Sequence, residues 1–433
     1  MSWPRWTCAS KISPFSGSTE TSSCAYSSTN AWARASASSM KPESTYGLQP
    51  QVASRAVTDV LIWADTLRSP EMRHEVPVVV PDPFLYLERD GERHVVITPF
   101  EVERVEGHDG LQPHAVEEFG WDDLVRQGIP MEEVELGTVI RAVKELGVRK
   151  AVVPSTFPLE LADRLRAQGV EITPDRETFV QRRRVKSDAE VEGIRRAQRG
   201  AEAGMDAARE LFRRAEEQDG RLLLDGEPLT CERVKMAIQQ TFTDLNLLCD
   251  EFIVSHGPQT AIGHEMGFGE IEPNEPIVLD LWPRDRESSC YADMTRTFVI
   301  GEPSEELAAY HKHVHEALER SVEAVKPGVA GRDVYVLASE LFHEAGYPTG
   351  LHKRDGEILE DGFFHGLGHG VGLEVHEQPW LGRYPGELVE GDVITIEPGL
   401  YRNGYGGCRL EDLVLVTKDG AELLTEYPYD LES

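Results

Sequence analysis

The chain has 433 residues, of which 40% are hydrophobic, and its formal net charge at pH 7 is −32. This length predicts two or three domains with substantial cores. The acidic charge argues against nucleic acid and anionic membranes as partners, because both favour basic surfaces. No stretch approaches the roughly eighteen apolar residues of a membrane-spanning helix. A solvated acidic surface is the simplest interpretation of the charge, and a surface that binds basic proteins such as histones is the alternative.

Residues 1–56 differ in composition from the rest of the chain. They are rich in Ser and Ala and contain only two acids, Glu20 and Glu43. They contain no continuous apolar segment, so a secretory signal is not expected, and the acid-poor, Ser-rich composition is only weakly typical of an organelle transit peptide. So few aliphatic residues cannot offset the entropy lost on ordering. We therefore expect a disordered leader, with a folded protein that begins near Val57.

The cysteines bear on the compartment in which the protein works. The six are Cys8, Cys24, Cys231, Cys249, Cys290 and Cys408. None forms a Cys-x-x-Cys pair, and a chain of this size does not depend on disulfides. We interpret them as reduced thiols of a cytoplasmic protein.

Residues 57–180 have the pattern of a mixed α/β domain. Strands are predicted at 60–64, 76–80, 84–88, 94–100 and 151–154, with a hairpin turn at 89–92. Helices are predicted at 134–147 and 159–169, because each of these amphipathic segments ends at a Gly. The histidines of this region, which are His74, His94, His108 and His114, lack the spacing of metal ligands. We expect no catalytic residue in this domain.

Residues 181–433 form the second predicted domain, which a basic run at 181–187 introduces. Ser187 and Glu190 form a capping box that opens a helix to about Glu217. Further helices are predicted after Thr230, after Ser304 and over 331–345. Helices interleaved with antiparallel hairpins predict an α+β domain whose sheet carries the functional residues. We interpret His311, His313 and His315 as a surface feature of the third helix.

The first of two acidic pairs lies in a predicted β-hairpin. Asp280 follows an apolar run, Asp293 precedes another, and a polar cluster at 284–289 separates them. If the turn is centred between Arg286 and Glu287, Asp280 lies directly opposite Asp293, about 5 Å away at Cβ. Like charges at that distance destabilise a sheet, so a cation is expected between them.

The second pair repeats this arrangement. Glu397 ends the apolar run 393–396, Glu411 follows Leu410, and a Gly-rich turn centred near Gly404 joins the two segments. Pairing across this turn sets Glu397 opposite Glu411. Four carboxylates can share a buried site only if they are protonated, paired with bases or bound to cations. The pattern points to a pair of metal ions.

A histidine is the remaining candidate ligand. His365 and His369 are four residues apart, which on a helix would form a zinc-binding pair. However, glycines alternate over 366–372, and each would disfavour a helix by roughly 1 kcal/mol. Alternating glycines indicate an extended segment with one closely packed backbone face. The two histidines then lie about 13 Å apart, so only one can join a compact metal site.

The two acidic pairs and the histidine between them, taken in sequence order, resemble the metal ligands of the pita-bread metallopeptidases. This family includes methionine aminopeptidase, aminopeptidase P, prolidase and the metal-free creatinase. The resemblance covers about residues 180–425. It implies two divalent metal ions, with Mn²⁺ expected and Co²⁺, Zn²⁺ or Fe²⁺ as alternatives. The five ligands that it implies are Asp280, Asp293, His369, Glu397 and Glu411. It also implies active-site roles for His264, His365, His376 and Arg409.

The resemblance also implies a mechanism. A hydroxide that bridges the two ions would be the nucleophile. Glu397 would take the proton that the water loses when it forms this hydroxide and would pass it to the leaving amine. His264 and His376 would hold the scissile carbonyl and the residue after it, and His365 would bind the leaving side. Arg409 would brace Glu411.

Three features depart from the family pattern. Trp282 occupies a position that is usually a small residue, the first hairpin is two residues longer than is common, and Gly263 replaces a frequent Pro. No ligand is lost, but these changes leave the shape of the substrate pocket open.

The resemblance implies that the predicted N-terminal domain, 57–180, is of the creatinase type. Methionine aminopeptidases lack such a domain, so the chain is expected to belong to the branch of aminopeptidase P and prolidase. We therefore expect hydrolysis of Xaa-Pro bonds in small peptides by a homodimer, with the dipeptidase and aminopeptidase alternatives both open. A metal-dependent lyase such as the family's dimethylsulfoniopropionate lyase is one alternative. A catalytically inactive pita-bread module that binds basic proteins is another, although inactive relatives lose ligands and all five are present here.

Overall fold

A computed structural model describes residues 58–108 and 110–432 of the chain. The leader expected at 1–56 lies outside the described residues, as do Cys8 and Cys24. The other cysteines, Cys231, Cys249, Cys290 and Cys408, are buried free thiols. Within the described ranges, no helix combines the length and apolar character needed to cross a membrane.

The N-terminal part of the described chain is built on a mixed six-stranded sheet of order β4-β3-β2-β1-β5-β6. The strands are β1 (Asp59–Ala64), β2 (Phe84–Arg89), β3 (Glu92–Ile97), β4 (Leu111–Ala115), β5 (Lys150–Val153) and β6 (Glu171–Pro174). β2 pairs antiparallel with β1 and β3, whereas β4, β5 and β6 join by parallel pairing. The predicted turn joins β2 to β3, where Asp90 and Gly91 have φ of 53° and 85°, as a tight hairpin turn requires.

Short helices accompany this sheet. They are α1 (Pro70–Glu75), α2 (Pro99–Val105), the 3-10 helix η1 (Val116–Phe119), α3 (Trp121–Val125), α4 (Met131–Glu145), α5 (Leu159–Ala167) and α6 (Arg176–Arg184). The two predicted helices are confirmed as α4 and α5. The strand predicted at 76–80 is wrong, because that segment is irregular. Pro77 and Pro81 lack the backbone N–H groups that a sheet ladder needs.

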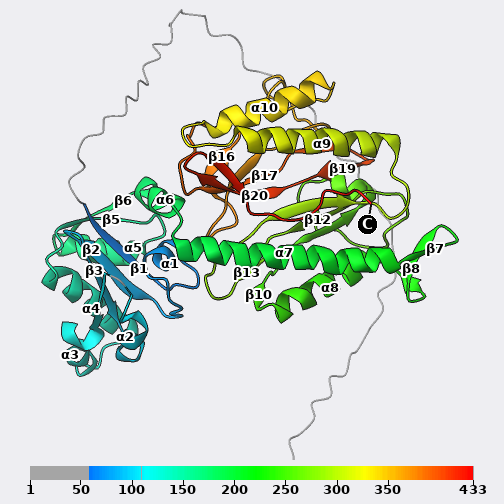
Figure 1. The fold of residues 1–433 in the computed structure, drawn as a ribbon. Coiled ribbons are helices and arrows are strands. Elements are labelled where there is room, and N and C mark those ends of the chain that lie inside the picture. The colour runs from blue at the N-terminus through cyan, green and yellow to red at the C-terminus, as the bar shows by residue number, and fades with distance from the viewer. Residues whose placement is uncertain (1–57, 109, 433) are drawn as a thin grey trace, which may run out of the picture. The chain divides into compact units, whose positions relative to one another are not determined.

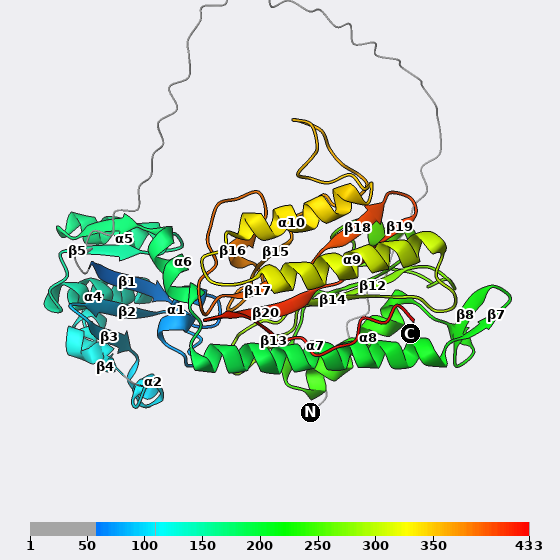
Figure 2. The same cartoon turned by 45° about the horizontal axis from the view of Figure 1, so that its top comes forward.

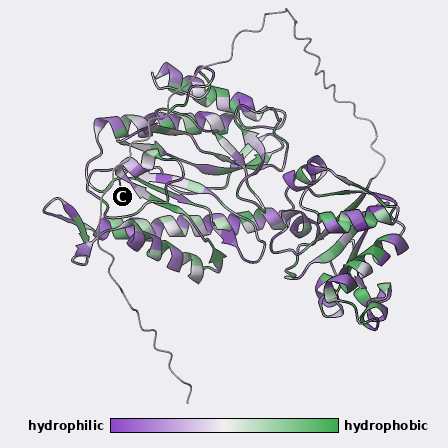
Figure 3. Cartoon of the chain, turned by 180° about the vertical axis from the view of Figure 1, so that it is seen from behind, coloured by the Kyte–Doolittle hydropathy of each residue, from purple (hydrophilic) through white to green (hydrophobic). Residues whose placement is uncertain are grey.

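The long helix α7 (Asp188–Arg214) begins at the predicted capping box. The Ser187 side chain accepts from the backbone N–H of Glu190, and the Glu190 carboxylate accepts from the backbone N–H of Ser187. Hydrophilic and hydrophobic residues alternate along this helix (Figure 3), as expected of a helix with one buried face. It ends three residues before the predicted Glu217, because residues 216–218 pair in a small sheet.

The remaining helices are α8 (Cys231–Asp244), the 3-10 helix η2 (Gly257–Ala261), α9 (Glu305–Ala324) and α10 (Gly331–Glu344). α8, α9 and α10 lie where they were expected, whereas η2 was not predicted. The His311 ring bonds to the carbonyl oxygen of Tyr429 at 2.7 Å, and the His315 ring lies 4.5 Å from the Tyr429 ring. Two of the three histidines on α9 therefore pack against the C-terminal segment, while all three stay half-buried at the surface, as a surface feature of this helix.

The strands of the C-terminal part form several small sheets. They are β7 (Glu216–Gln218), β8 (Arg221–Leu224), β9 (Glu227–Pro228), β10 (Leu247–Leu248), β11 (Ile253–His256), β12 (Ile277–Leu281), β13 (Arg284–Asp285), β14 (Met294–Phe298), β15 (Gly368–Gly370), β16 (Glu377–Leu381), β17 (Val393–Ile396), β18 (Gly399–Arg402), β19 (Gly406–Arg409), β20 (Asp412–Thr417) and β21 (Gly420–Leu423). Two of these sheets, of orders β11-β12-β14 and β16-β15-β17-β20-β21, carry candidate ligands on or beside their strands.

Helices cover these two sheets on opposite sides. In both views α7 and α8 lie along one side and α9 and α10 along the other (Figure 1, Figure 2). α7 and α8 share an apolar core with β12 and β14, whereas α9 and α10 share another with β17 and β20. The sheets are thus held between two helical layers, which gives an α+β architecture. The boundaries 57–180 and 181–433 stay predictions.

Candidate functional site

One cavity of about 670 Å³ brings together all the residues proposed for the site. Its lining includes Asp280, Asp293, His369, Glu397 and Glu411, together with His264, His365, His376 and Arg409. Asp280 lies on β12 and Asp293 directly before β14, His369 lies on β15, and Glu397 directly follows β17. Residues more than 140 positions apart thus meet at one point.

The register predicted for the first hairpin is wrong by two residues. Asp280 pairs with Thr295 and not with Asp293. The turn is centred one residue later than expected, between Glu287 and Ser288. The Asp285 side chain accepts from the backbone N–H of Ser288 at 2.8 Å, and the Asp285 carbonyl accepts from the N–H of Ser289. Ser289 adopts a positive φ of 65°, which its residue type does not predict. Asp293 therefore lies just beyond the strand, still beside the cavity.

The register predicted for the second ribbon is confirmed. β18 pairs with β19 through Gly399 and Arg409, and β17 pairs with β20 through Ile396 and Asp412. The register of both strand pairs is the one that places Glu397 opposite Glu411. Gly404, at the centre of the predicted turn, has a φ of 75°.

His369 lies on an extended strand, as its glycine neighbours predict. A Cβ on Gly368 would lie 2.0 Å from the carbonyl oxygen of Thr395, and one on Gly370 would lie 2.3 Å from that of Gln378. Only glycine allows the three strands to approach so closely.

The tautomer of His369 suits a metal ligand. Its Nδ1 lies 3.1 Å from the carbonyl oxygen of Gly370, which can only accept, so Nδ1 carries the proton. Its Nε2 lies 3.7 Å from both Asp293 Oδ2 and Glu397 Oε1. Burial, followed by the neighbouring His376, lowers the pKa of His369 to about 3. A neutral ring with a free Nε2 lone pair directed at carboxylates is typical of a ligand.

The carboxylates of the cavity have too little positive charge around them. Burial and the charges of the neighbouring acids raise the pKa of Asp293 and of Glu411 well above the ordinary range. Burial also raises the pKa of Glu397 to about 8. Asp293 Oδ1 is buried and has no hydrogen-bond partner within the described ranges. An orphaned buried oxygen among acids fits a bound cation.

Three side chains are already close enough to bind one ion. Ligand atoms of Asp293, His369 and Glu411 all lie within 4.8 Å of one another. Asp280 instead bonds to Arg409 Nη2. The oxygen-rich donor set with one imidazole therefore fits divalent cations.

The contacts of Arg409 differ from those expected. Its Nε donates to Thr295 Oγ1 at 3.2 Å, and Thr295 Oγ1 donates to Glu411 Oε2 at 2.8 Å. Arg409 thus reaches Glu411 only through Thr295, while its Nη2 pairs with Asp280. Thr295 was not expected in the site, since Thr in a strand is ordinarily structural.

Tyr401 is a second residue that the sequence did not reveal. Its hydroxyl lies 2.9 Å from His365 Nε2 and 3.2 Å from Arg409 Nη1. His365 Nδ1 lies 2.7 Å from the carbonyl oxygen of Gly366 and so carries the proton, which leaves Nε2 to accept from Tyr401. Burial, followed by Arg409, lowers the pKa of His365 to about 4. The position of Tyr401 four residues after Glu397 is the only sequence signal, and it is weak.

The other two histidines lie on the walls of the same cavity. The His376 ring lies 4.3 Å from the His369 ring, and His264 follows η2. Trp282, which departs from the family pattern, also lines this cavity. The residues that carry the resemblance and the residue that departs from it therefore face the same space.

Known proteins resemble this chain in sequence and in fold. Residues 192–418 match metallopeptidase family M24. The Xaa-Pro dipeptidase of Pyrococcus furiosus is 39% identical over 181 residues, which are 41% of this chain and 48% of that protein. The chain thus spans about half the length of the curated relatives that it matches first.

Solved structures extend the likeness to the N-terminal sheet. The prolidase from Pyrococcus horikoshii OT3 superposes with a TM-score of 0.66 at 25% identity, over 86% of this chain and 95% of that one. The X-Pro aminopeptidase from Thermotoga maritima shares the fold, with a TM-score of 0.69 at 22% identity over 86% of this chain and 97% of that one. The fold is therefore an N-terminal mixed α/β domain followed by a pita-bread domain, and the chain belongs to metallopeptidase family M24.

Proposed function

We propose that this chain is an exopeptidase that uses two divalent metal ions to hydrolyse Xaa-Pro bonds. The observation that carries the proposal is the single cavity lined by five potential ligands and three further histidines. The dipeptidase name of the Pyrococcus furiosus relative supports the choice of bond.

Five residues would hold the ions: Asp280, Asp293, His369, Glu397 and Glu411. Mn²⁺ is the proposed metal, because four carboxylates and one imidazole form a hard donor set. When bound, the ions would lower the pKa of a water molecule and polarise the substrate carbonyl.

The protein's own groups would position the peptide and move the proton. Glu397, whose Oε1 lies 3.7 Å from His369 Nε2, would accept a proton from the attacking water and pass it to the leaving amine. His264 and His376 would hold the scissile carbonyl and the residue after it. His365, held by Tyr401 at 2.9 Å, would contact the leaving side.

A peptide panel tests this proposal. The full chain, supplied with Mn²⁺, should cleave Ala-Pro and Ala-Pro-Gly peptides but not the matched Ala-Ala peptides. Glu397→Gln should keep the fold and lose activity by at least about 100-fold, as expected for loss of general acid-base catalysis. Failure to cleave either Xaa-Pro peptide would refute the proposed substrate class.

Metal analysis separates an enzyme from a binding module. We expect about two transition-metal ions per chain, and replacement of His369 by Ala should reduce that number. A protein that binds no transition metal would support the module for basic proteins, which the net charge of −32 otherwise suits.

A further inference from the structure

Two further cavities adjoin the candidate active site. The middle cavity has a volume of about 430 Å³ and shares Trp282 and Val375 with the active-site cavity. The outer cavity has a volume of about 350 Å³ and shares Arg284, Tyr291 and Val375 with the middle one. Because Val375 lines all three, the three cavities lie side by side. We call the outermost the arginine cavity, since Arg68, Arg73 and Arg284 line it.

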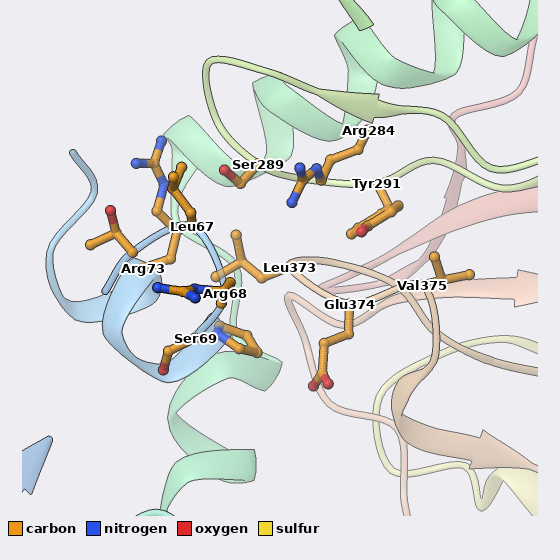
Figure 4. Close-up of a pocket in the computed structure, with 12 residues that line it drawn as sticks. Leu67, Arg68, Ser69, Arg73, Arg284, Ser289, Tyr291, Leu373, Glu374 and Val375 are labelled. Carbon is orange, nitrogen blue, oxygen red and sulfur yellow. The ribbon is translucent and has the colours of Figure 1, made fainter. Parts of the chain in front are cut away.

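Of the three arginines that line the arginine cavity, only Arg68 forms an ion pair within the described ranges. Figure 4 shows Arg284 and Tyr291 facing helix α1, which carries Arg73, and the segment before it, which carries Arg68. Arg68 is paired with Asp65 at 2.8 Å. The guanidinium of Arg284 lies 5.7 Å from the centre of the Tyr291 ring, and within the described ranges no carboxylate forms an ion pair with it.

Arg73 is the second arginine that forms no ion pair within the described ranges, although Asp285 and Glu190 lie near enough to favour its charge. It is only 4% exposed, and its Nε and Nη2 donate to the carbonyl oxygens of Ser288 and Glu287. Its Nη1 is buried without a partner within the described ranges. A buried guanidinium nitrogen without an acceptor is costly. The one acid that lines this cavity, Glu374, already accepts from Arg183 at 2.6 Å.

We propose that Arg284, beside the charge of the buried Arg73, binds the carboxylate at the far end of a peptide substrate, so that this chain prefers oligopeptides with a free C-terminus. The inference rests on the proposed function. An exopeptidase that releases one N-terminal residue holds a single residue before the scissile bond. Any path beyond the active-site cavity therefore receives the leaving part of the peptide, which ends in a carboxylate.

The spacing along β12 and β13 sets the length of that peptide. Arg284 follows Asp280 by four residues, and both belong to the same hairpin register. Their Cα atoms are therefore at most about 13 Å apart. An extended peptide covers that distance with about four residues. Peptides with three to five residues after the scissile bond would reach the arginine cavity, whereas a dipeptide would not.

The middle cavity adds a second element of selection. Asp250 and Glu251 line it and are exposed. Their charges disfavour an acidic side chain midway along the leaving part, so the carboxylate is accepted only at its end.

The test compares peptides that differ only in the terminal charge. Ala-Pro-Gly-Gly-Gly with a free carboxylate should have a kcat/KM about tenfold higher than its C-terminal amide, as expected for one charge-assisted contact. In Arg284→Met this ratio should fall to about one, and Arg284→Lys should retain most of it. Arg286→Met is the matched control, because Arg286 is an exposed arginine two residues away that lines none of the three cavities, and it should retain the full ratio.

The ratio is independent of how much protein folds, because both peptides are measured on one preparation. Calorimetric titration with the leaving peptide Pro-Gly-Gly-Gly, as acid and as amide, gives the same comparison without turnover. If no Xaa-Pro peptide is cleaved, the proposed function fails, while the titration still tests the arginine cavity. A wild-type ratio below about two, or a ratio that Arg284→Met leaves unchanged, would overturn the inference.

Discussion

Replacing Gly368 by Ala should disrupt the candidate metal centre without touching a ligand. The new Cβ would lie 2.0 Å from the carbonyl oxygen of Thr395 and 2.8 Å from its carbonyl carbon. An ordinary carbon–oxygen contact is about 3.3 Å, so the two strands must separate by more than about 1 Å. Thr395 also holds the backbone of His369, through a hydrogen bond of 3.2 Å from the N–H of His369 to its Oγ1, and lies two residues before Glu397. Two ligands would therefore move together.

A displacement of about 1 Å costs roughly 100-fold in rate, and overpacking costs about 1–3 kcal/mol of unfolding free energy. We expect Gly368→Ala to lower kcat/KM for an Ala-Pro peptide by about that factor and to lower the Mn²⁺ content measured after gel filtration. Gly382→Ala is the matched control, since this buried glycine also has no positive φ and its nearest neighbour, Tyr384, lies 3.6 Å away. If Gly368→Ala retains wild-type metal content and activity within threefold, the close strand contact does not determine the site.

Three other predictions address the stability of the fold. Lys186→Met leaves the buried Glu377 carboxylate with only Arg183, at 3.6 Å, and should lower the unfolding free energy in urea by about 3 kcal/mol; a loss below 1 kcal/mol would show that this ion pair is dispensable. Ser187→Ala removes the cap of α7 and should cost about 1 kcal/mol in thermal unfolding, with Ser187→Asp retaining most of the stability. Chelation of metal should lower Tm, and Mn²⁺ at a hundred times its Kd should restore about 2.7 kcal/mol; an unchanged Tm would contradict a metal site in the native protein.

The sequence predicts those parts of the site in which a required glycine or a buried charge allows only one local structure. Gly404 fixes the second turn and with it the register that sets Glu397 opposite Glu411. The glycines beside His369 predict its strand, because each lies against a carbonyl of a neighbouring strand. The first hairpin gives no such signal. Its turn depends on the side chain of Asp285 and on a positive φ at Ser289, and neither is specified by a local pattern.

Contacts between distant segments explain the other failures. The arginine cavity joins Arg73 on α1 to Arg284, which is 211 residues away, and Arg73 hydrogen-bonds to the carbonyls of residues 287 and 288. No periodicity links these positions. Likewise, Thr295 and Tyr401 have strand-like neighbours, and the sequence predicts both as core residues. Only the folded chain shows that the Thr295 hydroxyl connects Arg409 to Glu411 and that the Tyr401 hydroxyl connects Arg409 to His365.

The basic run at 181–187 shows why the segment before α7 matters to the site. Arg183 Nη2 donates to Glu374 Oε2 at 2.6 Å, and Lys186 Nζ donates to Glu377. These two acids lie on either side of His376, which lines the active-site cavity. The run therefore holds both ends of the short loop that carries this histidine. Because His376 is not a proposed metal ligand, a substitution in the run should impair peptide binding before it impairs metal binding. The segment before α7 therefore contacts the loop that carries His376, and we expect it to help position the substrate.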